Sequence, residues 1–147
     1  MLERDKDSEW VAPYFAQTKP KSNMVRFLSD FSNLNKKLKR KPYSMSKINW
    51  ILLKLEGFQY ATSLYLNMGY YCIRLRKNAN NLCTTILPWG KYCYKCLQME
   101  ISNSPDIFQQ KMNDLFHGFD FICAYIDDLL ILIKKLYWTD HVQNICN

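Results

Sequence analysis

The stretch CAYIDDLLIL, residues 123–132, places two adjacent carboxylates between two apolar runs. Residues 121–126 and 129–133 are predicted to form a hairpin with Asp127 and Asp128 at its tip. A two-residue hairpin turn normally prefers Asn-Gly or Asp-Gly, because the tight turn requires positive φ. Two carboxylates at a strand tip could instead hold a divalent cation through oxygen ligands. Taken alone, the segment is consistent with a solvated turn or with half of a metal site.

The segment NSPDIFQQKMNDLFHGF, residues 103–119, carries the clearest helix signal in the chain. We expect Ser104 to cap the helix, Pro105 to occupy its first turn and Gly118 to end it. Apolar residues recur at helical spacing and form the predicted buried stripe, which consists of Ile107, Phe108, Met112, Leu115 and Phe116.

The remaining elements are predicted from the same two periodicities. Strands are expected at residues 24–28, 59–66 and 71–76, and residues 84–99 resemble a hairpin that turns at Trp89-Gly90. A helix is expected between Ser46 and Gly57, with Ile48, Ile51, Leu52 and Leu55 on one face. This order predicts an α+β domain with a mainly antiparallel sheet backed by helices.

Composition limits the class of protein. A chain of 147 residues with 48% hydrophobic and 15% aromatic residues is expected to form one folded domain. The six cysteines are too few for a disulfide scaffold, and the charged start MLERDKDSEW lacks the apolar segment of a signal peptide. The longest apolar stretch, residues 121–133, is too short to cross a bilayer. We therefore expect an intracellular protein, in the cytoplasm or nucleus, with reduced thiols and no membrane role.

The net charge of +7 is concentrated in residues 21–57, which alone carry a net charge of +7. Its densest part is a run of five cations, Lys36, Lys37, Lys39, Arg40 and Lys41. Such a run is consistent with a solvated loop or with contacts to a phosphate backbone.

Together these segments resemble the reverse transcriptase of gypsy-type LTR retroelements. The resemblance rests on DSEWVAPYF, MVRFLSDFSNLNKKLKRKPYS, KLEGFQYATSLYLNMGYYCIRL, LPWGKYCYKCLQMEISNSPDIFQQKM, YIDDLLIL and WTDHV, in collinear order over residues 7–141. It implies that the 147 residues are a single fragment of a polymerase right hand without a thumb. Residues of about 7–42 and 76–98 would be fingers, and residues of about 43–75 and 99–141 would be palm.

The resemblance also implies an RNA-directed DNA polymerase, a nucleotidyltransferase that acts on a primer–template and dNTPs with two Mg²⁺ ions. Asp127 and Asp128 would be catalytic metal ligands, and the backbone carbonyl of Leu66 would complete a metal shell. The chain would once have belonged to a larger polyprotein with a thumb and a ribonuclease H.

Other positions match the family's substrate contacts. Arg26 would bind the triphosphate, Tyr70 would lie below the sugar, Met99 would border the nucleotide pocket, and Gln109 with Phe108 would support it. The basic run of residues 36–41 would lie near the template.

Two departures from the family pattern predict loss of activity. Tyr65 stands where the family has its first catalytic aspartate, and a neutral phenol is a poor Mg²⁺ ligand. Gln98 and Glu100 replace a proline and a glycine, and a carboxylate near incoming phosphates would repel them. We expect an inactive enzyme.

Several alternatives stay open. The chain could be a non-enzymatic nucleic-acid-binding remnant that uses the basic run, or a relic with no function. Cys93-x-x-Cys96 allows a zinc site, although no second pair lies at a suitable spacing. Tyr70 could be a core residue, and His141 a surface residue.

Overall fold

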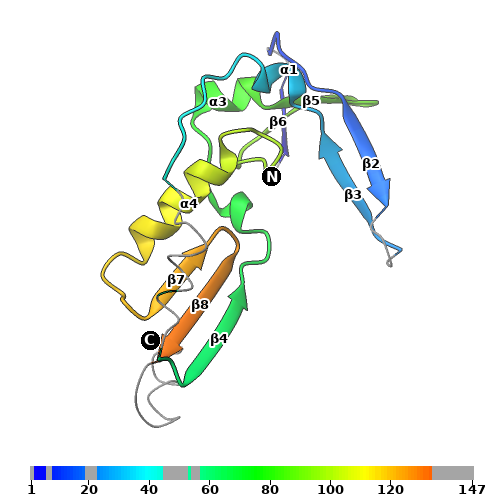
Figure 1. Cartoon of the computed structure of the whole chain (residues 1–147). Helices are drawn as coiled ribbons and strands as arrows, with labels where there is room; N and C mark the ends of the chain where they lie inside the picture. Colours follow the sequence, from blue (N-terminus) through cyan, green and yellow to red (C-terminus); the bar gives the residue numbers. More distant parts are fainter. Residues whose placement is uncertain (1, 6–7, 19–22, 45–52, 54–56, 134–147) are drawn as a thin grey trace. The chain divides into compact units, whose positions relative to one another are not determined.

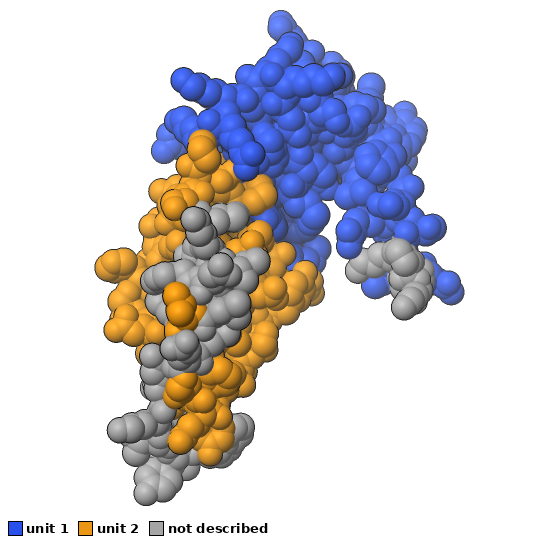
Figure 2. Space-filling model, viewed as in Figure 1, with its two compact units in different colours: residues 1–41, 68–104 blue, residues 42–67, 105–147 orange. Residues whose placement is uncertain are grey.

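The chain forms two compact units, residues 1–41 with 68–104 (unit 1) and residues 42–67 with 105–147 (unit 2), which are coloured separately in Figure 2. A computed structural model describes residues 2–5, 8–18, 23–44, 53 and 57–133. The elements of each unit are shown in Figure 1.

Unit 2 contains an antiparallel sheet with the strand order β4-β8-β7. Its strands are β4 (Tyr60–Tyr65), β7 (Ile122–Tyr125) and β8 (Asp128–Ile133), and helix α4 (Ser104–Leu115) runs beside the sheet (Figure 1). The central strand β8 is almost entirely apolar after Asp128, and Leu129 and residues 131–133 are buried. A nearly continuous apolar run is what a strand covered on both faces requires. The predicted strand at residues 59–66 and the predicted hairpin at residues 121–133 are therefore confirmed.

The turn of this hairpin lies one residue earlier than expected. Tyr125 pairs with Asp128, so Ile126 and Asp127 form the turn and Asp128 begins β8. Ile126 has a φ of +50°, a conformation that β-branched residues rarely adopt. The residue with positive φ thus precedes the Asp-Asp pair.

Helix α4 is confirmed, but its buried face is narrower than the predicted stripe. Phe108 and Met112 are buried, whereas Ile107 and Leu115 are 38% and 66% exposed. Gln109 is buried beside Phe108. Hydrophobicity alone could not identify this polar residue as part of the packed face. The hydroxyl of Ser104, the predicted cap, donates to the carbonyl of Gln98 at 2.6 Å.

Unit 1 contains a second antiparallel sheet, with the order β1-β6-β5, and a separate two-stranded hairpin of β2 and β3. The strands are β1 (Leu2–Arg4), β2 (Tyr14–Thr18), β3 (Val25–Ser29), β5 (Thr84–Leu87) and β6 (Gly90–Tyr94). The predicted strand at residues 24–28 and the predicted hairpin after residue 84 are confirmed. Leu87 pairs with Gly90, so the turn consists of Pro88 and Trp89 rather than Trp89-Gly90.

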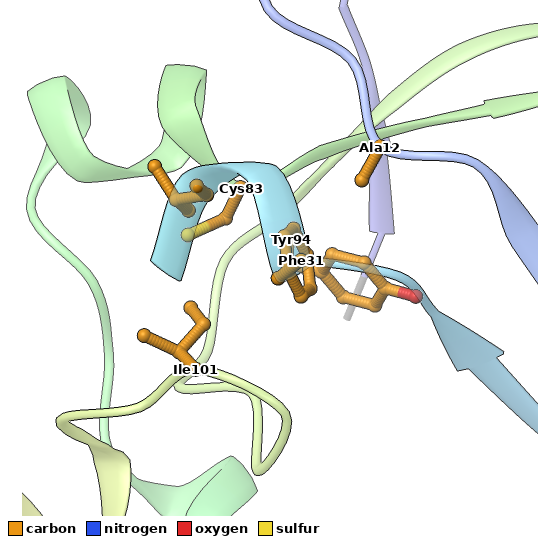
Figure 3. Packing of buried hydrophobic residues seen from close by; sticks show 6 residues of the cluster. Ala12, Phe31, Cys83, Tyr94 and Ile101 are labelled. Atoms are coloured by element: carbon orange, nitrogen blue, oxygen red, sulfur yellow. The ribbon is translucent and has the colours of Figure 1, made fainter. Parts of the chain in front are cut away.

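Three short helices complete the described part of unit 1, namely α1 (Ser32–Asn35), the 3₁₀ helix η1 (Gly69–Cys72) and α3 (Lys77–Leu82). The core of this unit gathers residues that are far apart in the sequence, as Figure 3 shows. The ring centroids of Phe31 and Tyr94 lie 6.1 Å apart in an edge-on contact, and the hydroxyls of Tyr94 and Ser29 share a hydrogen bond of 2.8 Å. The whole cluster consists of Ala12, Phe31, Leu34, Cys83, Tyr94 and Ile101.

The predicted strand at residues 71–76 is wrong. Met68 has a φ of +60°, and η1 follows, with the Tyr71 amide donating to the Met68 carbonyl at 3.0 Å. Residues 73–76 then run extended, and α3 begins at Lys77. Aromatic and β-branched residues favour strands, but tertiary contacts override this preference.

The expected helix between Ser46 and Gly57 lies outside the described residues except for Leu53 and Gly57. The predicted α+β class, with antiparallel sheets and few helices, is confirmed. Within the described part of the chain, no helix is both long enough and apolar enough to cross a membrane.

Candidate functional site

The carboxylate tip of unit 2 brings Tyr65 directly beside Asp128. Asp128 pairs with Tyr65 of β4 on one side and with Tyr125 of β7 on the other. Residues that face each other across antiparallel strands carry their side chains on the same face of the sheet. The predicted lost-ligand position therefore lies next to a predicted metal ligand, and its phenol is 68% exposed.

Asp127 lies in the turn, against the start of the segment that follows β4. The amide of Leu66 donates to the Asp127 carbonyl at 2.7 Å, which joins two of the predicted metal-binding positions through their backbones. The Oδ1 atom of Asp127 is buried without a hydrogen-bond partner. Burial, with a smaller contribution from the charge of Asp128, raises the pKa of the Asp127 carboxyl.

The predicted ligands would fit one divalent cation better than two. Mg²⁺ typically uses one or two protein carboxylates together with substrate phosphates, and Asp127 with Asp128 meets that minimum. A pair of ions about 4 Å apart would need a further shared carboxylate, and the residue paired with Asp128 is instead Tyr65. Within residues 2–133, apart from the gaps in the description, no group of three or more His, Cys, Asp or Glu side chains could hold a metal ion.

Gln109 of α4 fixes the conformation of the carboxylate turn. The amide of Ile126 donates to Gln109 Oε1 at 2.7 Å, and Gln109 Nε2 donates to the Ala124 carbonyl at 2.9 Å. Gln109 is only 1% exposed. These bonds hold Ile126 in its unusual conformation, and such outliers concentrate at functional sites. The predicted contact between Gln109 and a nucleotide stays a prediction.

A second polar link on α4 was not predicted from the sequence. Gln109 Nε2 also donates to Asn113 Oδ1 at 2.9 Å, and Asn113 Nδ2 donates to the Tyr43 hydroxyl at 3.0 Å. The amide of Tyr43 donates to Asp106 Oδ1 at 2.9 Å. The spacing of four residues between Gln109 and Asn113 was the available signal, since such residues are neighbours on a helix surface.

The other predicted nucleotide-binding residues belong to unit 1. Arg26 is on β3, opposite Gln17, Tyr70 is in η1 and 8% exposed, and Met99 is 42% exposed. The burial of Tyr70 agrees equally well with a core role and with a sugar contact, so both interpretations stay open. Arg26 interacts electrostatically with Glu100, which lies next to Met99 in the chain.

Glu100 is a half-buried carboxylate without a hydrogen-bond partner for its Oε2 atom. Burial raises the pKa of its carboxyl, while the Arg26 guanidinium acts in the opposite direction. The backbone here is fixed by Asn35, whose Nδ2 donates to the Glu100 carbonyl and whose Oδ1 accepts from the Ser102 amide, both at 2.9 Å. Sequence reasoning identified Glu100 but missed Asn35.

Gln98, the other departure at this loop, is buried. Its Nε2 donates to the Cys96 carbonyl at 2.9 Å, which satisfies part of this buried amide. The described residues other than glycine with positive φ are Met68 and Ile126, so Glu100 adopts no left-handed conformation. Glu100 therefore introduces a charge at this loop and no backbone strain.

The five cations of the basic run are all exposed. Lys37 Nζ lies 4.8 Å from the ring centroid of Trp10, and the Lys39 carbonyl accepts a hydrogen bond from Asn103 Nδ2 at 3.3 Å. The ammonium group of Lys37 thus contacts an aromatic ring, and the backbone of Lys39 is held by a hydrogen bond. This arrangement is compatible with both interpretations of the run.

The fold of the chain resembles that of solved reverse transcriptases. The chain superposes on the Prototype Foamy Virus Protease-Reverse Transcriptase with a TM-score of 0.82 at 22% identity, over 98% of this chain and 19% of that one. It also matches the foamy viral protease-reverse transcriptase in complex with an RNA/DNA hybrid, with a TM-score of 0.84 at 19% identity and the same coverage. At these identities the likeness shows the fold.

Sequence comparison shows the family. The model described as "Reverse transcriptase (RNA-dependent DNA polymerase)" matches residues 17–146. The chain therefore belongs to the reverse transcriptase family.

Its relatives are polyproteins. An enzymatic polyprotein of Cassava vein mosaic virus is 31% identical over 134 residues, which cover 88% of this chain and 21% of that protein. The Transposon Tf2-3 polyprotein of Schizosaccharomyces pombe is 29% identical over 127 residues, which cover 85% of this chain and 9% of that protein. The chain thus spans about a fifth or less of the length of these relatives.

Proposed function

We propose that this chain is the fingers-and-palm part of a gypsy-type retroelement reverse transcriptase that has lost its polymerase activity. By descent it is an RNA-directed DNA polymerase that used a primer–template, dNTPs and two Mg²⁺ ions. Its fingers are residues of about 7–42 and 76–98, and its palm is residues of about 43–75 and 99–141. The observation that carries the proposal is the register that places Tyr65 opposite Asp128.

The loss of one carboxylate at this point is costly because only two carboxylates are left to balance the charge of two divalent cations. Asp127 and Asp128 are adjacent, and the charge of Asp128 contributes to the raised pKa of Asp127. Without the third carboxylate, two divalent ions lack their main counter-charge. If metal stabilisation supplies several kcal/mol, its loss lowers the rate by at least ~10³-fold.

In this proposal Glu100 also weakens binding of the nucleotide, which must precede the reaction. In the proposal, Arg26 contacts the triphosphate, Tyr70 lies below the sugar and Met99 borders the pocket, with Gln109 supporting the catalytic turn. The electrostatic interaction of Glu100 with Arg26 supports a carboxylate close to the proposed phosphate site. A negative charge there competes with the triphosphate for the guanidinium.

Primer extension tests the proposal. The unmodified chain, Tyr65→Asp and the double variant Tyr65→Asp with Glu100→Gly are compared with Mg²⁺ and with Mn²⁺. We expect no extension by the unmodified chain, little by Tyr65→Asp, and more by the double variant. Adding Asp127→Asn to the double variant is the matched control and should abolish extension. Robust extension by the unmodified chain would contradict the proposed inactivity.

A second candidate function is binding of nucleic acid without catalysis. Its support is the exposure of all five cations at residues 36–41. Neutralising phosphates with several cations makes the affinity fall steeply as salt concentration rises. Binding of a primer–template should therefore show a linear, steep dependence of log Kd on log salt that becomes shallower when Lys36 and Lys37 are changed to Gln. Weak binding that does not depend on salt would remove this candidate.

A further inference from the structure

Unit 1 contains a pocket that shares no residue with the proposed polymerase site. It has a volume of about 340 Å³ and is lined by Arg74, Leu75, Asn80, Lys95 and Cys96. Two extended segments form its wall, because Arg74 pairs with Cys96 and the Leu75 amide donates to the Lys95 carbonyl at 2.8 Å. Helix α3 contributes Asn80. Hydrogen bonds between backbones thus fix the wall that carries both cations.

The lining has the chemistry of a phosphate site. Arg74 and Lys95 are exposed cations, while Leu75, Asn80 and Cys96 are half-buried. A guanidinium offers a planar fork of donors to a phosphate, and an ammonium adds a point charge. Arg76 and Lys77 follow in the chain and add to the positive potential. The volume lies at the lower end of the range for small-ligand pockets, which is about 300–1,000 Å³.

An acid of β1 neutralises one of these cations. Lys95 Nζ lies 2.7 Å from Glu3 Oε2, and the two side chains are 51% and 57% exposed. An ion pair this exposed contributes little, because water screens the charges and both side chains lose conformational freedom. Glu3 can therefore be displaced from Lys95 by an anion that also binds Arg74.

We propose that this pocket binds a phosphate group of a nucleotide, and that Glu3 competes with the phosphate for Lys95. The phosphate could belong to a free nucleotide or to a nucleic-acid strand, since both present the same group. In either case, binding exchanges the Glu3 carboxylate for a phosphate oxygen at Lys95 and leaves the carboxylate in water.

Cys96 provides a readout at the pocket itself. It lines the pocket, whereas Cys72 is exposed and is not part of the lining. Burial raises the pKa of Cys83 to about 12 and also raises the pKa of Cys93, so both thiols are slow to react with alkylating agents near pH 8. Alkylation by iodoacetamide, followed by peptide mass spectrometry, measures the reaction of each thiol separately. The rate at Cys96 can therefore be compared with the rate at Cys72, which lies outside the pocket lining.

The experiment measures alkylation of the full chain with inorganic phosphate, adenosine 5′-monophosphate or a single-stranded RNA of twelve nucleotides. Chloride at matched ionic strength is the control. We expect the phosphate compounds to slow alkylation at Cys96 and to leave Cys72 unchanged. Protection by RNA at much lower concentrations would identify a strand as the source, and equal protection by the mononucleotide would identify a free nucleotide. Absence of protection at Cys96, or equal protection at Cys72, would overturn the proposal.

Substitutions of the two partners of the Lys95–Glu3 ion pair should have opposite effects on protection. Lys95→Gln and Arg74→Gln should each weaken protection, by about tenfold for the charge-assisted contacts of Arg74. Glu3→Gln should strengthen protection by about two- to fivefold, because Lys95 no longer has a competitor. A misfolded variant cannot produce this gain, so the Glu3 variant keeps the test decisive. Lys111→Gln, an equal charge change on α4, should have no effect, and a change as large as that of Lys95→Gln would contradict a local site.

Discussion

At the residue scale, the aromatic ring at position 65 matters because of its neighbour. The register places Tyr65 beside Asp128, while Asp127 keeps a buried carboxylate oxygen without a partner. A cation is the natural partner for such an oxygen, because the negative charge of Asp128 lies next to it in the chain. The proposed loss of a metal ligand at position 65 therefore concerns a residue directly beside the carboxylate pair.

Glu100 gives a pH-dependent prediction at the same scale. Burial raises the pKa of its carboxyl above the usual value near 4.5, so the folded state favours the protonated form. The corresponding stability is present below the unfolded pKa and is lost as pH rises through the folded pKa. Glu100→Gln should match the parent chain below pH 4.5 and be more stable at pH 7.5, by about 1 kcal/mol for a poorly paired buried acid.

Thermal unfolding between pH 4 and pH 8 measures this difference. Glu9→Gln is the matched control, because Glu9 is exposed in the same unit. Its curve should follow that of the parent chain throughout. Equal stability of Glu100→Gln and the parent chain at pH 7.5 would show that the ionised Glu100 carboxylate does not destabilise the folded state.

The proximity of Tyr65 and Asp128 could be predicted at this scale because motifs specify residue types at fixed spacing. Tyr65 and Asp128 were assigned to one site from collinear motifs, and β4 and β8 place them side by side. Asn35 could not be predicted, since its role depends on a loop that lies more than sixty residues away in the chain. Local patterns contain no information about such long-range hydrogen bonds.

At the scale of elements, the link between α4 and the β7–β8 hairpin positions the carboxylates. Gln109 accepts from the Ile126 amide and donates to the Ala124 carbonyl, so one buried side chain satisfies two backbone groups of the hairpin. The predicted apolar stripe of α4 contains Phe108 and Met112, which are buried. It also contains Ile107 and Leu115, which are exposed. Periodicity identifies the helix, whereas the polar residue that aligns it is found only in the structure.

Gln109→Ala should therefore destabilise unit 2 more than a surface change does. The variant leaves the Ile126 amide and the Ala124 carbonyl, which belong to half-buried residues, without this partner, and each such group costs about 1–3 kcal/mol when water does not replace the bond. We expect a loss of about 2–4 kcal/mol in the free energy of unfolding, measured by urea denaturation. Gln110→Ala, an exposed neighbour on the same helix, should change it by less than about 0.5 kcal/mol. Similar losses for both variants would mean that helix propensity, and not the link to the hairpin, sets the effect.

At the scale of the whole molecule, the chain alternates between two compact units, each with its own sheet. The predicted α+β class was correct, because hairpin and helix signals are local. The prediction of a strand at residues 71–76 failed. Residues 69–72 form η1 instead, and backbone pairing is limited to residues 73–75 with residues 95–97. Contacts between distant segments thus decided the part of unit 1 that local patterns could not.

A substitution in the core of unit 1 tests how far the stability of its segments depends on their mutual packing. Phe31 is 2% exposed and packs with residues from three distant segments, among them Ala12, Cys83 and Ile101. Phe31→Ala should lower the stability of this unit by about 3–5 kcal/mol, because it removes a buried ring and leaves a cavity. Hydrogen exchange should then show faster exchange for the amides of Ala12 and Tyr94, which are bonded to Thr84 and Cys83 across the sheet. Phe15→Ala, which removes a ring that is 47% exposed on β2, should leave these amides protected, and equal loss of protection in both variants would contradict a core centred on Phe31.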